Sequence, residues 1–249
     1  MRKIDELLLL TGSDIPFGAA RVTIHQPRLK ELGFIGEENF HIGSHFLLFD
    51  KNKLPDKDNS NLGVKSNFDI FMSVMNSKDV AKHRTDALMV LTLLFPDMNI
   101  KVETEQILLQ NEKFTSSIND KNFSEFQSIL AQMFCLEDMV EEDNEFDPID
   151  PLAARIAQKI KKARQKRAEI KNETIKENSQ ITIYSKFISI LTIGLQKNMN
   201  DFSDYTVYQL RDEFKRFTLK QNFDIYVQQK LAGAENVEEV ENWMEDLHP

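Results

Sequence analysis

The chain has 249 residues, of which 41% are hydrophobic and 29% are charged, which is the composition of a globular rather than a disordered protein. Its formal net charge of −9 disfavours nonspecific binding of nucleic acid by the surface as a whole. With only 8 glycines and 7 prolines, a loop-rich β-sandwich is disfavoured and helices with few breaks are expected. The 18 phenylalanines predict a phenylalanine-rich core.

The first fifty residues are expected to have mixed structure. Leu7–Leu10 and Arg21–His25 have the composition of strands, with turn residues between them. Pro27 is compatible with the first turn of a short helix that runs through Leu32. The stretch Glu37–Phe49 is ambiguous between helix and strand.

Hydrophobic periodicity defines the elements of the next part of the chain. Ser66 or Asn67 is expected to cap a helix, and Val80–Phe95, apolar on nearly all sides, predicts the central buried helix. Between Asn99 and Ile118 apolar and polar residues alternate, which predicts a small antiparallel meander. A further helix is expected to carry its apolar residues at Phe123, Phe126, Ile129, Leu130 and Met133.

Residues 137–151 mark the clearest boundary. They contain eight acids and two prolines, so we expect a solvated linker. A basic helix from Leu152 to about Lys171 should follow. Three more helices are expected at Ile181–Leu195, Val207–Leu231 and Val237–Leu247. The predicted fold class is mainly α (α+β), with an N-terminal α+β domain at residues 1–136 and a C-terminal helical domain at residues 152–249.

The sequence contains no recognisable catalytic signature. His41 and His45 are four residues apart, as zinc ligands on a helix can be, but no cysteine or further histidine lies nearby in the sequence. The single cysteine, Cys135, has apolar neighbours and is expected to be a buried side chain in a protein of a reducing compartment. We therefore expect a protein that is not an enzyme and that uses no cofactor and no metal.

Targeting and membrane segments are also not expected. The apolar run at Leu7–Leu10 is too short for a signal peptide, and no stretch approaches the roughly 18 apolar residues that span a bilayer. The sequence predicts a cytoplasmic protein without a membrane partner.

The basic helix at residues 155–171 is one candidate binding surface. Lys161, Lys162 and Arg164 lie at its centre, and Glu169 is the only acid in it. The helix can pair with the acidic linker, dock on an acidic partner protein, or bind nucleic acid. It contains no aromatic residue for base stacking, so nucleic acid is the least favoured of these partners.

The C-terminal tract is the second candidate surface. It carries more apolar and aromatic residues than one helix usually buries, so its side chains either form the core of the helical domain or are offered to a partner helix. The residues expected to contact a partner are Phe214, Phe217, Phe223 and Trp243.

Two further segments are informative: IHQPRLKELGFIGEENFHIG at residues 24–43 and the helical tract that starts YTVYQLRDEFKRF at residue 205. Both resemble segments of tail assembly chaperones of tailed bacteriophages that infect Gram-positive hosts. The resemblance implies a non-catalytic protein of the host cell cytoplasm that binds the tape measure protein and tail tube subunits during virion morphogenesis. A structural subunit of the tail or baseplate, a nucleic-acid-binding regulator that uses residues 155–171, and a homo-oligomer remain open as alternatives.

Overall fold

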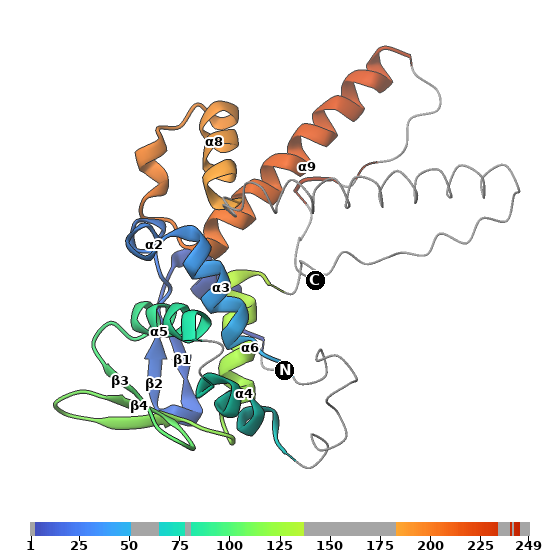
Figure 1. The fold of residues 1–249 in the computed structure, drawn as a ribbon. Helices are drawn as coiled ribbons and strands as arrows, with labels where there is room; N and C mark the ends of the chain where they lie inside the picture. Colours follow the sequence, from blue (N-terminus) through green and yellow to red (C-terminus); the bar gives the residue numbers. More distant parts are fainter. Residues whose placement is uncertain are drawn as a thin grey trace, which may run out of the picture.

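The computed structural model describes residues 3–50, 65–77, 81–136, 183–233, 240 and 242–244. Helices dominate it, and the described strands form two small antiparallel sheets in the N-terminal half (Figure 1). The predicted mainly α (α+β) class is confirmed. The linker at residues 137–151, the basic helix at residues 155–171 and most of the expected helix Val237–Leu247 lie outside the described residues.

The run of leucines near the N-terminus is a helix, α1 (Glu6–Thr11), and the prediction of a strand at Leu7–Leu10 is wrong. Local capping decides this. The Asp5 side chain accepts a hydrogen bond from the Leu7 N–H, and Gly12 closes the helix in the left-handed conformation at φ 65°. Four consecutive leucines fit the hydrophobic pattern of a helix and that of a strand equally well. The capping residues Asp5 and Gly12 therefore decide between the two structures.

The first sheet and two helices follow α1. Strands β1 (Ile15–Phe17) and β2 (Val22–Ile24) pair across the short 3-10 helix η1 (Gly18–Ala20), which confirms the strand expected in Arg21–His25. Helices α2 (Leu29–Ile35) and α3 (Glu37–Leu47) come next, so the ambiguous stretch after Gly36 is helical.

Helix α3 lies against α5 (Ala81–Leu94), and their close approach requires a glycine. A Cβ on Gly43 would lie 2.4 Å from the carbonyl oxygen of Asp86. Between these two helices in sequence, α4 (Asn67–Met75) begins with a capping box at Ser66, as predicted. The core-facing positions of α5 include Val90, Leu91 and Leu94.

The predicted meander is confirmed. Strands β3 (Asn99–Val102), β4 (Ile107–Gln110) and β5 (Thr115–Ile118) form an antiparallel sheet in the order β3-β4-β5. One face of this sheet is buried through Ile107, Leu109 and Ile118. Helix α6 (Phe123–Phe134) then packs on β1, with the apolar positions that the sequence predicted.

The remaining described elements are α8 (Ile183–Leu195), the 3-10 helix η6 (Met199–Phe202) and α9 (Val207–Leu231). Helix α9 packs on α1 and α6, and backbone hydrogen bonds join Leu29 N–H to the Tyr205 carbonyl and Lys30 N–H to the Ser203 carbonyl. These elements therefore complete the hydrophobic core of the N-terminal half. The division into domains at residues 1–136 and 152–249 stays a prediction.

The core is rich in phenylalanine, as composition predicted. Its largest fully buried side chains include Phe17, Phe40, Phe71, Phe95, Phe123, Phe126, Phe134 and Phe202. Cys135 differs from expectation because it is only half-buried. It stands just after α6 in the left-handed conformation at φ 50°, which ends the helix.

Candidate functional site

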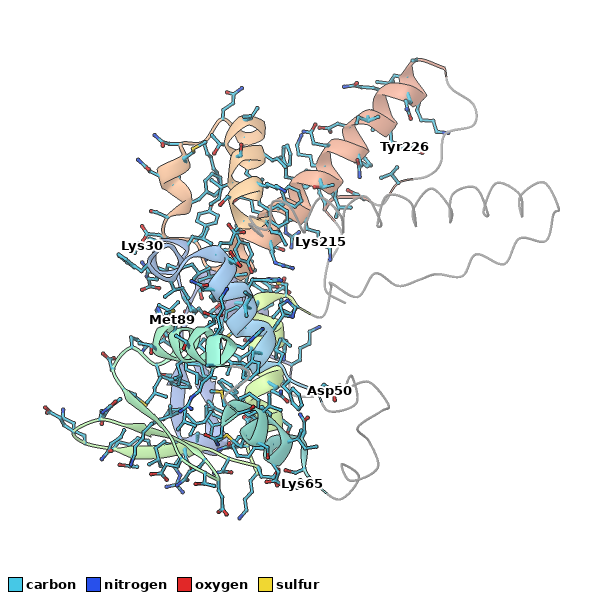
Figure 2. The ribbon with its side chains drawn as sticks, viewed as in Figure 1. Lys30, Asp50, Lys65, Met89, Lys215 and Tyr226 are labelled. Atoms are coloured by element: carbon cyan, nitrogen blue, oxygen red, sulfur yellow. The ribbon has the colours of Figure 1, made fainter. Side chains whose placement is uncertain are left out.

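Helix α9 is anchored at its first turn and projects from the body for the rest of its length (Figure 1). The Thr206 side chain accepts from the Gln209 N–H, and the Gln209 side chain accepts from the Thr206 N–H, which closes a capping box. Val207, Tyr208 and Leu210 are the buried residues of this helix. Figure 2 shows Lys215 near the base of the projecting part and Tyr226 farther out along it.

Helix α8 packs against the base of α9 through aromatic rings. Phe187 and Phe214 stack with their centroids 4.0 Å apart and an interplanar angle of 14°. One turn farther along, the Phe217 ring lies so close to Gly194 that a Cβ there would be 2.3 Å from the ring. The sequence-predicted partner residues Phe214 and Phe217 therefore contact α8 within the chain.

The other predicted partner residues lie farther from the body or cannot be placed. Phe223 is half-buried on the projecting part of α9, with its ring 6.4 Å from that of Tyr226. Trp243 is half-buried as well. Lys161, Lys162 and Arg164 lie outside the described residues, so partner contact at all of these positions stays a prediction.

Glu37 fixes the start of α8 from the neighbouring helix α3. Its carboxylate accepts hydrogen bonds from the Tyr184 N–H at 2.5 Å, the Ser185 N–H at 3.3 Å and the Ser185 hydroxyl at 2.8 Å. A carboxylate at a helix N-terminus satisfies unpaired N–H groups and interacts favourably with the helix dipole. An acid of the N-terminal half thus caps α8.

A second polar contact holds the segment between α8 and α9. Asp204 receives Lys30 Nζ at 2.6 Å and the Arg28 guanidinium at 3.1 Å. The hydrogen bonds from Lys30 and Arg28 hold the pKa of the Asp204 carboxyl below its usual range. Together with the cap at Glu37, this contact joins α8 and the segment after it to the N-terminal half.

Lys197 ties the end of α8 back to α9. Its ammonium donates to Glu213 and to the Tyr205 hydroxyl and lies 5.6 Å from the centre of the Phe202 ring. Partial burial alone would lower the pKa of Lys197, but the hydrogen bonds to Glu213 and Tyr205 raise it. The Lys197 ammonium therefore makes these contacts within the unit formed by α8, η6 and α9, which we call the α8–α9 unit.

The opposite face of α8 carries apolar side chains in solvent. Ile190 is 45% exposed and Ile193 is 79% exposed, whereas Leu191 between them is fully buried. Near its far end, α9 exposes Ile225 and Leu231. We name the outer side chains Ile190 and Ile193 the α8 outer face. Sequence reasoning missed this surface because apolar residues lie on several sides of α8, and only the structure tells which side faces the body.

The two histidines on α3 are neighbours in space, with ring centroids 4.3 Å apart. Burial, then His45 and Arg211, lowers the pKa of His41 from 6.5 to about 4. No group of three or more His, Cys, Asp or Glu side chains within the described ranges is arranged to hold a metal ion. In the same part of the chain, no helix is both long enough and apolar enough to cross a membrane.

Part of the chain is similar to a known protein family. Residues 176–248 match the family model described as the YomV second domain, and YomV is a Bacillus phage protein. No curated protein and no solved structure matches the chain. The matched region includes both α8 and α9, so the similarity to the phage protein falls on the unit that projects from the body.

Proposed function

We propose that this protein is a non-enzymatic tail assembly chaperone, which binds the tape measure protein and tail tube subunits of a phage through the α8–α9 unit. One observation carries the proposal: the α8–α9 unit exposes apolar side chains on its outer side, while its inner side packs in the body. Ile193 and Leu231 are 79% and 83% exposed, while Tyr208 and Leu210 of the same unit are buried in the body.

Two further facts support a phage partner of helical structure. The unit belongs to the region that matches a phage protein domain. An exposed apolar face on a helix is the kind of surface that packs against an apolar stripe of another helix. A tape measure protein is expected to be a long helical chain that exposes such stripes before assembly, which is the property the resemblance to tail assembly chaperones implies.

The acidic balance of the chain fits the same role. A chaperone must keep an aggregation-prone partner in solution, and a net charge of −9 favours solubility of the complex. The exposed isoleucines provide contact, and the net negative charge of the chain opposes further association.

The test is co-expression of the full chain with the tape measure protein encoded near its gene, followed by measurement of the soluble, co-purifying fraction of that protein. We expect the wild-type chain to keep the partner soluble and the double variant Ile190→Asp/Ile193→Asp to lose most of this effect. Leu7→Asp is the matched control, because Leu7 is 65% exposed on α1, outside the α8–α9 unit.

The outcomes separate the proposal from its rivals. A partner that stays insoluble with the wild-type chain overturns the chaperone function. Presence of the protein in purified virions assigns it to the tail or baseplate structure instead. If Leu7→Asp loses as much activity as the double variant, the α8 outer face is not the contact surface.

A further inference from the structure

The three-stranded sheet has two edges, and they differ in how they are protected against pairing with another chain. Edge strands usually carry charges or prolines that prevent such pairing. Strand β3 carries Lys101 and lies against α5. Strand β5 has the sequence Thr-Ser-Ser-Ile, with neither a charge nor a proline.

The register shows which backbone groups of β5 point away from the sheet. The Asn111 N–H donates to the Phe114 carbonyl, so these two residues form a hydrogen-bonded pair. Such pairs alternate along an antiparallel ladder, so Ser116 bonds to Leu109, while Thr115 and Ser117 direct their N–H groups outward. The Ser117 carbonyl accepts from the Asn122 side chain, but within the described ranges no hydrogen bond is made by the outward N–H groups of Thr115 and Ser117.

A groove of about 380 Å³ runs along this edge. Its lining comes from β5, from the segment that ends η1, from the adjoining part of β4 and from the residues after β5, namely Gln106, Leu108, Asn119 and Asn122. A hydrogen bond from the Ser116 hydroxyl to the Ala20 carbonyl at 2.5 Å joins β5 to the η1 segment. Arg21 is the one charged residue that lines the groove, and it makes no ion pair with any described residue. Phe114, 37% exposed, adds an aromatic ring to the lining.

We propose that this groove binds an extended peptide segment of a partner protein, which adds as a short strand to the edge of β5 and places a carboxylate against Arg21. The added strand would form main-chain hydrogen bonds with β5, and the residues that line the groove would select the side chains of the peptide. The uncompensated Arg21 charge selects an acidic residue, and the Phe114 ring selects an apolar one. This surface is separate from the α8–α9 unit and does not depend on the tail assembly function.

The test uses the full chain and a yeast-displayed library of random short peptides. We expect the selected peptides to combine β-branched residues with an acid, and to bind Arg21→Glu at least about tenfold more weakly, since a charged pair becomes a repulsion. Lys113→Glu is the matched control, because it reverses a charge on the same hairpin but outside the groove lining. Its binding should stay close to that of the wild type.

A second variant separates edge pairing from charge. Thr115→Pro removes one outward N–H and leaves the ladder to β4 intact, so the fold should persist and peptide binding should fall about tenfold. Circular dichroism checks that both variants fold. If the selected peptides bind both variants as tightly as they bind the wild type, or if the library yields no binding peptide, the proposal is overturned. A dimer that Thr115→Pro dissociates would also overturn it, because the occupant would then be a second copy of β5.

Discussion

Single residues set the distance between the two most closely packed helices. Gly43 of α3 faces the backbone of α5, where a Cβ would lie 2.4 Å from the Asp86 carbonyl oxygen and 2.8 Å from Val90. The helices cannot separate locally, because Phe40 and Leu47 on the same helix are buried in the core. The contact therefore has no flexible atom that could yield to a larger side chain.

Gly43→Ala is expected to destabilise the protein. Overpacking of this kind costs ~1–3 kcal/mol, more than the gain of up to about 1 kcal/mol in helix propensity. Gly33→Ala is the control, since Gly33 lies in α2 with nothing within 4 Å of its Cβ position, and there the propensity gain should appear alone. Urea unfolding measures both. A Gly43→Ala protein as stable as the Gly33→Ala protein would contradict the packing argument.

His41 should make stability fall in mild acid. Its folded pKa of about 4 lies below the ordinary 6.5, mainly because burial disfavours the charged imidazole. Above pH 6.5 His41 is neutral in both states and adds no pH dependence. Between pH 6.5 and 4 the unfolded chain binds a proton that the folded chain does not, so stability decreases as pH falls. Melting temperatures across this range should therefore fall less steeply for His41→Gln than for the wild type, and a parallel pair of curves would refute the assignment.

At the scale of elements, polar contacts from α3 hold the first turn of α8. Glu37 and Glu38 both lie in the first turn of α3, so both interact equally well with the dipole of that helix. Only Glu37 also caps α8, through Tyr184 and Ser185.

Glu37→Ala should therefore cost about 1 kcal/mol or more, as the loss of an N-cap does, and Glu38→Ala should cost much less. Thermal unfolding of the two variants gives the comparison directly. Amide hydrogen exchange tests the cap locally, because the first amides of α8 should exchange faster in Glu37→Ala but not in Glu38→Ala. Equal effects of the two substitutions would mean that the cap contributes nothing beyond the α3 dipole.

Sequence pattern predicted most elements because their period or caps are local. The meander follows from alternation between Asn99 and Ile118, and α9 follows from its long apolar pattern. Helix α3 was ambiguous because Gly43 lowers helix propensity, yet packing on α5 requires that same glycine. The contact of Phe214 with α8 joins residues distant in sequence, so no local pattern could show that this ring is used within the chain.

At the scale of the whole molecule, α8, η6 and α9 belong to the same core as the N-terminal half. The buried side chains that they contribute are Tyr184, Leu191, Phe202, Val207, Tyr208 and Leu210. On the other side of this contact, Phe40 and Phe134 are each 1% exposed, and the Phe40 ring lies 5.0 Å from Phe134 and 6.2 Å from Tyr184. Their burial depends on the C-terminal helices.

A chain that stops at residue 136 should therefore be far less stable than the full chain. Buried apolar side chains contribute ~1.5–3 kcal/mol each, so this contact is worth on the order of 10 kcal/mol, comparable with the whole stability of a typical domain, about 5–15 kcal/mol. The fragment should bind a hydrophobic dye and melt broadly, whereas the full chain should unfold its core in one transition. A fragment that melts as sharply and at the same temperature as the full chain would show instead that residues 1–136 are an independent domain, and that the C-terminal helices only rest on its surface.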